Sequence, residues 1–157
     1  MTPLQARYVH TSLVALDWRR LCEFYIQVFG CQPVLPERHL EDPWVEKATG
    51  VPGAAIHGMH LRLPGYDGAG PTLEIFQYNN LAAGDSPAIN RPGLAHLAFA
   101  VEDVSGALSA VLAAGGRQVG ELVYVHVPGV GLLSFVYAAD PEGNLLELQK
   151  WGQVLDG

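Results

Sequence analysis

Basic residues are scarce in this 157-residue sequence, where nine Lys and Arg stand against 16 Asp and Glu and give a formal charge of −7. The densest basic spot is the pair Arg19 and Arg20. Nucleic-acid-binding domains usually carry a clustered basic face. The charge balance therefore argues against a protein that binds a phosphate backbone, and we expect no nucleic-acid partner.

Long apolar runs and cysteine clusters are also missing. The longest apolar stretches, such as Leu97–Val101, are far shorter than the roughly 20 residues of a membrane span. Residues 1–10 lack the basic segment and apolar stretch of a secretion signal. The two cysteines, Cys22 and Cys31, form neither a disulfide framework nor a zinc-finger pattern. We expect a cytoplasmic protein with two reduced thiols and no membrane partner.

Apolar residues, in contrast, are abundant. They make up 49% of the sequence, whereas only 16% of the residues are charged. This is enough apolar mass to bury the core of one domain over residues 1–157. The 18 glycines and 11 prolines are spread along the chain. Many tight turns between short elements are therefore expected, rather than a helical bundle.

The chain contains an internal repeat. Residues 9–17 align with residues 95–103, and each copy is an apolar, strand-like run that carries one histidine and ends in an aspartate. After each aspartate, apolar residues recur at spacings of three and four until a glycine. This pattern predicts one helix over 17–30 and another after residue 103, because Asp favours the N-cap and Gly the C-terminal end of a helix.

The two halves also end alike, each on an apolar strand with one embedded glutamate, at 72–78 and 145–151. A turn at Asp140–Gly143 precedes the second strand, and a loop at 64–71 precedes the first. Further strands are expected at 54–63, 119–127 and 132–138. Each half then follows the order strand, helix, strand, strand, strand. The extra residues of the first half, at 36–53, are expected to form a loop with a short helix that ends at Gly50.

Four chemically versatile residues occupy matching places in the two halves: His10 and His96 on the first strands, and Glu74 and Glu147 on the last strands. A glutamate in an apolar strand is costly to bury unless it is paired or ligated. The alternative is that each glutamate lies on the exposed face of its strand. Two imidazoles and two carboxylates suit one divalent metal ion such as Zn, Ni, Co, Fe or Mn.

On these residues the chain resembles the glyoxalase/vicinal-oxygen-chelate superfamily, which includes bleomycin-resistance proteins and extradiol dioxygenases. The resemblance spans residues 8–151 and includes the turn Asp140–Asn144. It implies an α+β fold of two tandem βαβββ modules, 8–80 and 93–152, whose curved mixed sheets form a cleft around one metal. In the glyoxalase I branch the ligands are His, Glu, His and Glu, which match His10, Glu74, His96 and Glu147.

The resemblance also implies a function. We expect a metal-dependent lyase or isomerase, glyoxalase I-like or epimerase-like, that binds the vicinal oxygens of a small-molecule substrate through the metal. Glu74 or Glu147 would move the proton. A homodimer is expected as well, because two small modules expose strand edges that a twofold partner can cover.

Some positions depart from the family pattern. Val14 stands where glyoxalase I enzymes usually carry an arginine that contacts glutathione, and Tyr78 stands where they carry an asparagine. Methylmalonyl-CoA epimerase, a relative, takes a glutamine ligand from an earlier strand, and residues 54–63 contain no glutamine. Two alternatives stay open: a metal-free binding protein of bleomycin-resistance type, and an Fe(II) extradiol-type dioxygenase. Surface or loop positions are expected for the remaining histidines: His39, His57, His60 and His126.

Overall fold

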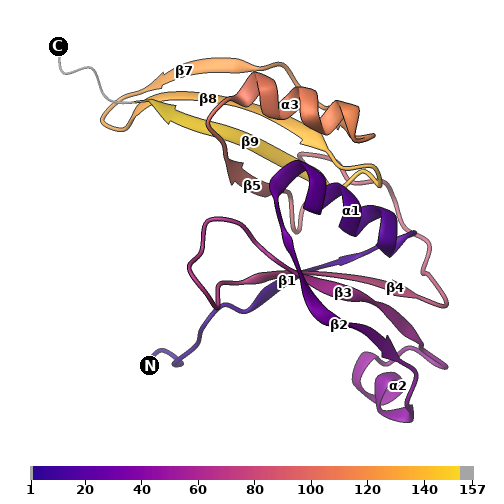
Figure 1. Cartoon of the computed structure of the whole chain (residues 1–157). Coiled ribbons are helices and arrows are strands. Elements are labelled where there is room, and N and C mark those ends of the chain that lie inside the picture. The colour runs from indigo at the N-terminus through magenta and orange to yellow at the C-terminus, as the bar shows by residue number, and fades with distance from the viewer. Residues whose placement is uncertain (1, 153–157) are drawn as a thin grey trace. The chain divides into compact units, whose positions relative to one another are not determined.

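The computed structural model describes residues 2–152 and divides the chain into two compact units, of which the first ends at Ala83 and the second begins at Gly84. We call them the N-terminal and C-terminal modules. Each contains a mixed β-sheet with a helix packed on it (Figure 1). The predicted α+β class with two mixed sheets is confirmed. Over the described residues, no helix has the length and apolar character needed to cross a membrane.

The N-terminal module contains, in order, β1 (His10–Val14), α1 (Trp18–Phe29), β2 (Gln32–Leu40), α2 (Pro43–Thr49), β3 (Ile56–Arg62) and β4 (Thr72–Tyr78). Its strands lie in the order β1-β4-β3-β2. β1 runs parallel to β4, and the other neighbours are antiparallel. The first and last strands of the module are therefore adjacent.

The C-terminal module contains β5 (Leu97–Ala100), α3 (Val104–Ala113), β6 (Arg117–Gln118), β7 (Val123–Val127), β8 (Gly131–Ala139) and β9 (Leu145–Gly152). Its strand order is β5-β9-β8-β6, and β7 also pairs with β8. β5 runs parallel to β9, and β8 antiparallel to β9. The two halves of the sequence repeat thus share one strand topology.

α1 begins and ends where the sequence predicts. The side chain of Asp17 accepts a hydrogen bond from the backbone N–H of Arg20 at 3.1 Å, and Gly30 closes the helix at a φ of 68°. The helix packs on β3 and β4 (Figure 1). Its buried stripe comprises Trp18, Leu21, Cys22, Phe24 and Tyr25. One face of the N-terminal sheet is therefore covered by α1.

α3 occupies the matching place in the C-terminal module and packs on β8 and β9. Asp103 sits at its N-cap with extended backbone, yet within the described chain its side chain makes no capping hydrogen bond. Asp103 thus takes the predicted N-cap position, but without the expected side-chain hydrogen bond. The carboxylate lies against the backbone of Gly106 instead. Burial of Val104, Leu108 and Val111 holds this helix on its sheet.

β2 departs from the sequence prediction, which placed a loop from residue 36 onward. It runs as an edge strand through Pro33 and Pro36. Its register against β3 shifts between Val34 and Arg38. Prolines are tolerated at sheet edges and bulges, where a backbone donor is not needed for the ladder. The short helix that follows, α2, ends at Gly50 as predicted, at a φ of 70°.

The predicted turn before β9 is confirmed. Asp140 is only 2% exposed. Its carboxylate accepts hydrogen bonds from the backbone N–H groups of Glu142 (2.9 Å) and Asn144 (3.0 Å) and from Nδ2 of Asn144 (2.8 Å). Gly143 adopts a φ of 92°, which an L side chain rarely adopts. The turn returns the chain antiparallel to β8 and so places Glu147.

Candidate metal centre

Glu74 lies on the face of the N-terminal sheet opposite α1. Its strand neighbours Leu73 and Ile75 are fully buried, and successive side chains of a strand point to opposite faces. The sheet register places Ser12 of β1 and His60 of β3 beside Glu74. His10 precedes Ser12 by two residues and so lies on the same face. Three strands therefore bring His10, His60 and Glu74 together.

These three side chains form a compact donor set. Oε2 of Glu74 lies 3.0 Å from Nε2 of His60 and 3.7 Å from Nε2 of His10. One potential ligand atom from each residue lies within 4.8 Å of the other two. The side chains of Glu74 and His60 are 15% and 18% exposed, and that of His10 is 38% exposed. The set is thus half-buried and partly open to solvent.

The chemistry of this donor set fits a borderline divalent metal. Two imidazole nitrogens and one carboxylate oxygen are ligands that Zn, Fe, Co and Ni accept. The hydroxyl of Thr72 fixes the orientation of the His60 ring, because its oxygen lies 3.0 Å from Nδ1, the ring nitrogen that does not face Glu74. Such a partner on the second ring nitrogen is typical of metal-binding histidines. His10, His60 and Glu74 can therefore hold a metal ion.

Burial lowers the pKa of His60. The carboxylate of Glu74 opposes this shift, whereas His10 and Arg38 add to it. A lowered pKa keeps the imidazole neutral to more acidic pH than an ordinary histidine. The neutral ring is the form that binds a metal or accepts a proton.

The structure corrects the expectation for His60, which is neither a surface nor a loop residue. It lies in the interior of β3 and faces Glu74 across the ladder. His57, three residues earlier, lies on the opposite face, as the strand period predicts. The position of His60 could not be found from the repeat, because the matching residue of the C-terminal module is not a histidine.

The C-terminal module contains the second predicted pair. Nε2 of His96 lies 2.9 Å from Oε2 of Glu147, and the two side chains are 26% and 15% exposed. Ala98 pairs with Glu147 in the same register in which Ser12 pairs with Glu74. Each predicted histidine therefore lies beside the predicted glutamate of its own module. That the four residues share one metal stays a prediction.

Tyr137 takes the place of His60 in the C-terminal module. It pairs with Glu147 across the β8–β9 ladder, as His60 pairs with Glu74. Its ring centroid lies 5.1 Å from that of His96. The N-terminal module thus offers two imidazoles and a carboxylate, whereas the C-terminal module offers one imidazole, a carboxylate and a phenol.

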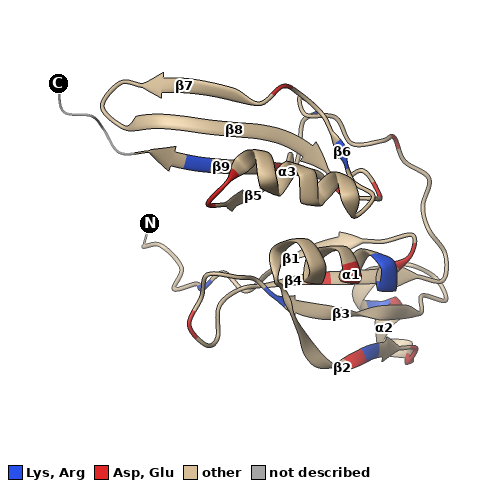
Figure 2. Ribbon diagram, turned by 45° about the horizontal axis from the view of Figure 1, so that its top comes forward, with Lys and Arg blue, Asp and Glu red and all other residues tan. Residues whose placement is uncertain are grey.

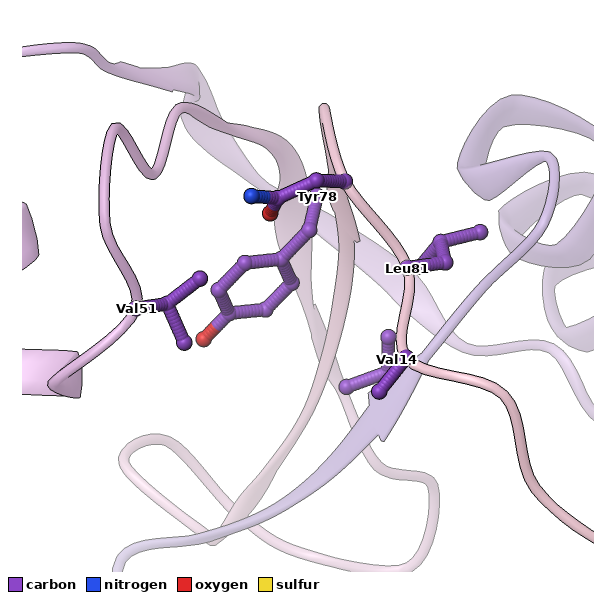
Figure 3. Close-up of a pocket in the computed structure, with 6 residues that line it drawn as sticks. Val14, Val51, Tyr78 and Leu81 are labelled. Carbon is purple, nitrogen blue, oxygen red and sulfur yellow. The ribbon is translucent and has the colours of Figure 1, made fainter.

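An apolar pocket of about 410 Å³ lies on the same face of the N-terminal sheet as Glu74. It is lined by Val14, Val51, Tyr78, Asn80, Leu81 and Ala82. Figure 3 shows the ring of Tyr78 extending toward Val51, with Val14 and Leu81 nearby. Tyr78 follows Glu74 by four residues along β4, and Val14 follows His10 by four along β1. The pocket and the donor set therefore share one face of the sheet.

Comparison with known families agrees with this architecture. The family model of the Glyoxalase/Bleomycin resistance protein/Dioxygenase superfamily matches residues 7–148. The chain therefore belongs to this superfamily.

Solved structures with the same fold include several relatives of low sequence identity. A glyoxalase family protein from Bacillus cereus is 20% identical with a TM-score of 0.73, covering 98% of this chain and 97% of that one. A glyoxylase/bleomycin resistance protein/dioxygenase domain from Frankia sp. EAN1pec is 18% identical with a TM-score of 0.57. The match covers 97% of this chain and 95% of that one. A glyoxalase/bleomycin resistance protein/dioxygenase family enzyme from Burkholderia phytofirmans PsJN is 14% identical with a TM-score of 0.58. The match covers 94% of this chain and 100% of that one. No curated protein sequence matches the chain.

Proposed function

We propose that the protein is a metal-dependent lyase or isomerase, glyoxalase I-like or epimerase-like, that acts on a small oxygenated substrate. The observation that carries the proposal is the half-buried donor set of His10, His60 and Glu74. The pair His96 and Glu147 of the other module supports it, as does membership of the superfamily.

The ligands in this proposal are His10, Glu74, His96 and Glu147, which would hold one divalent ion such as Zn, Ni, Mn, Co or Fe. Bound there, the ion would supply Lewis-acid stabilisation of negative charge on two neighbouring substrate oxygens. His60 lies on β3, the strand before the one that carries Glu74. Methylmalonyl-CoA epimerase likewise takes its glutamine ligand from an earlier strand. His60 is therefore the residue that can replace Glu74 as a ligand.

Glu74, rather than Glu147, is the proton-transferring carboxylate in this proposal. Its Oε2 lies 3.0 Å from Nε2 of His60. The hydroxyl of Thr72 is within hydrogen-bond distance of the other ring nitrogen and can either donate or accept. The neutral ring of His60 can thus share the proton that Glu74 removes from the substrate carbon. Glu147 is opposite Tyr137 in the ladder, and the imidazole beside it is that of His96, which is itself a metal ligand in this proposal.

The pocket on the same sheet face as the donor set favours a substrate with an apolar portion. Its lining is largely aliphatic and aromatic. Val14 places an apolar side chain where glyoxalase I enzymes usually carry a glutathione-binding arginine. A substrate group that enters this pocket gains by burying apolar surface rather than by pairing with a charge. We therefore propose a substrate other than a glutathione adduct.

The proposal is tested by the metal content of tag-free protein, measured by elemental mass spectrometry after reconstitution with Zn, Ni, Mn or Fe(II). We expect about one metal per chain in the proposed site, lost in His10→Ala, Glu74→Ala and Glu147→Ala. His126→Ala, which removes an exposed histidine on β7, is the control and should keep the metal. Absence of metal after every reconstitution would favour the metal-free binding protein. Unchanged metal content in the three variants would overturn the ligand assignment.

A second candidate function is an Fe(II) extradiol-type dioxygenase. It is favoured by one observation, namely that a single module presents two histidines and one carboxylate, His10, His60 and Glu74. This combination, with open coordination positions, is the ligand set of non-haem Fe(II) oxygenases. Oxygen consumption with a catechol after anaerobic loading with Fe(II) would support it. No oxygen uptake by the iron-loaded protein would dismiss it.

We also propose that the protein is a cytoplasmic homodimer. Its two cysteines are free and buried, Cys22 at 4% and Cys31 at 2% exposure, which suits a reducing compartment. Sedimentation of the tag-free protein tests the assembly, and a monomer at micromolar concentration would contradict it.

A further inference from the structure

Two histidines meet on the other face of the N-terminal sheet. His39 of β2 and His57 of β3 are directly opposite each other in the ladder. Their Nδ1 atoms are 2.8 Å apart, and their rings are nearly perpendicular at 80°. His57 points away from the face that holds His60, because the two residues are three positions apart on one strand. The pair is therefore separate from the donor set of His10, His60 and Glu74.

Each ring of this pair has a carboxylate behind it. Nε2 of His57 lies 2.9 Å from Oε1 of Glu41, and Nε2 of His39 lies 3.6 Å from Oε2 of Glu37. Arg19 of α1 holds Glu37 through two hydrogen bonds of 2.8 and 2.9 Å. That pairing lowers the pKa of Glu37. Figure 2 shows an acidic (red) and a basic (blue) stretch of ribbon next to each other on β2.

If both imidazoles direct a proton toward their carboxylates, no proton is left between the two Nδ1 atoms. Nε2 of His57 is within hydrogen-bond distance of Glu41, and Nε2 of His39 faces Glu37 at 3.6 Å, so the tautomer with a proton on each Nε2 suits both carboxylates. The two Nδ1 atoms then face each other with lone pairs at 2.8 Å. They need a shared proton or a metal ion between them, since two lone pairs at this distance repel. A divalent ion can accept both lone pairs while each Nε2 keeps its proton toward its carboxylate.

We propose that His39 and His57 form a second metal site, which binds one Cu²⁺, Ni²⁺ or Zn²⁺ through the two Nδ1 atoms. Metal-bound histidines usually donate their other N–H to a carboxylate or carbonyl, and Glu37 and Glu41 occupy those places. Two nitrogens on a tetrahedral zinc ion are roughly 3.3 Å apart, given bonds of about 2.05 Å. The half-exposed rings need to separate by only about half an ångström from their present spacing.

The surroundings of the pair can admit the ion and its remaining ligands. The side chains of His39 and His57 are 53% and 38% exposed. They border a hollow of about 320 Å³ that Trp18, Arg19 and Gln77 also line. Water or a small anion would complete the coordination there. Since the two ligands belong to neighbouring strands, the bound ion would tie the edge strand β2 to β3.

The test counts metal equivalents on the full chain. Metal-free protein is titrated with Zn²⁺ and with Ni²⁺ by calorimetry, for the wild type and for His39→Ala, His57→Ala, His10→Ala and His126→Ala. We expect the first two variants to lose one equivalent that His10→Ala and the control His126→Ala both retain. The double variant His10→Ala/His57→Ala should lose this equivalent together with the one assigned to the donor set.

A further variant separates ligation from structural damage. Glu41→Gln keeps both imidazoles and should weaken the second equivalent about 10- to 100-fold, because it alters only the group behind His57. If an alanine variant loses the circular dichroism of the folded chain, His39→Gln and His57→Gln replace it in the same titration. Equal equivalents in the wild type and in folded variants at positions 39 and 57, or the same loss in His126→Ala, would overturn the proposal.

Discussion

His60 and Tyr137 occupy the same place in the two modules, each directly opposite the glutamate of its own last strand. The backbone pattern of the repeat is thus retained while the side chain differs. An imidazole beside Glu74 adds a donor nitrogen, whereas a phenol beside Glu147 does not. Among residues 2–152, this difference gives the N-terminal module a cluster of three potential metal ligands that the C-terminal module lacks.

Tyr137→His should give the C-terminal module a donor set like that of the N-terminal one. We expect Zn²⁺ to bind at least about tenfold more tightly, equivalent to 1.4 kcal/mol, when this change is made in a Glu74→Ala background. The affinity is measured by competition with a chromophoric chelator. Tyr137→Phe removes the hydroxyl without adding a nitrogen and should give no gain. Equal affinities of the histidine and phenylalanine variants would contradict the prediction.

His60→Ala should weaken metal binding about 10- to 100-fold, because it removes either a ligand or the group that holds Glu74. The same titration on Ser12→Ala provides the control, since Ser12 also lies beside Glu74 in the sheet but offers no imidazole. We expect Ser12→Ala to bind like the wild type. A wild-type affinity in His60→Ala would show that this residue plays no part in the centre.

Acid should destabilise the metal-free protein partly through His60. Burial lowers the pKa of His60 in the folded state, whereas the unfolded chain titrates near the ordinary value of about 6.5. Below that pH the unfolded state binds a proton that the folded state resists, so the free energy of unfolding falls as the pH falls. Urea midpoints in chelator at pH 7.5 and 5.5 measure this. The urea midpoint of His60→Gln should fall less between these two pH values than that of the wild type. An identical fall in both proteins would contradict a role of His60 in the acid sensitivity.

Alkali should destabilise the protein through its two thiols. Burial raises the pKa of Cys22 to about 12 and that of Cys31 to about 11. The unfolded chain releases these protons at lower pH, so the stability present below about pH 9 declines as the pH rises toward the folded values. Urea midpoints between pH 8 and 10.5 should fall less in Cys22→Ala/Cys31→Ala than in the wild type. Equal slopes in the two proteins would refute this explanation.

Gly58→Ala should destabilise the N-terminal module by about 1–3 kcal/mol through overpacking. A Cβ at this position would lie 2.6 Å from Cδ1 of Phe76 and would also meet the carbonyl oxygen of Ile75. The ring of Phe76 contacts that of His60 edge-on, with centroids 5.7 Å apart, so the donor set should be disturbed as well. Thermal unfolding measures the loss. Gly84→Ala, where a Cβ meets open space, should change stability little.

The parts of the structure that could be predicted from the sequence are those that occur in both copies of the repeat. Strand, helix and final strand recur with their histidine and glutamate, so both sheets and both His–Glu pairs follow. β2 was missed because Pro33 and Pro36 are unfavourable within a strand interior, and only pairing at a sheet edge with a register shift accommodates them. His60 was missed because its role depends on the register between β3 and β4, which a single sequence does not specify.

The parallel pairing of β1 with β4 also bears on how the protein is made. Parallel neighbours must be joined by a long crossover, and here β2, β3 and two helices lie within it. Contacts so distant in sequence are slow to form, because the chain loses loop entropy before it gains them. A nascent chain on the ribosome therefore lacks the donor set until β4 has emerged and inserted between β1 and β3. Metal uptake by the N-terminal module would then report completed folding of that module.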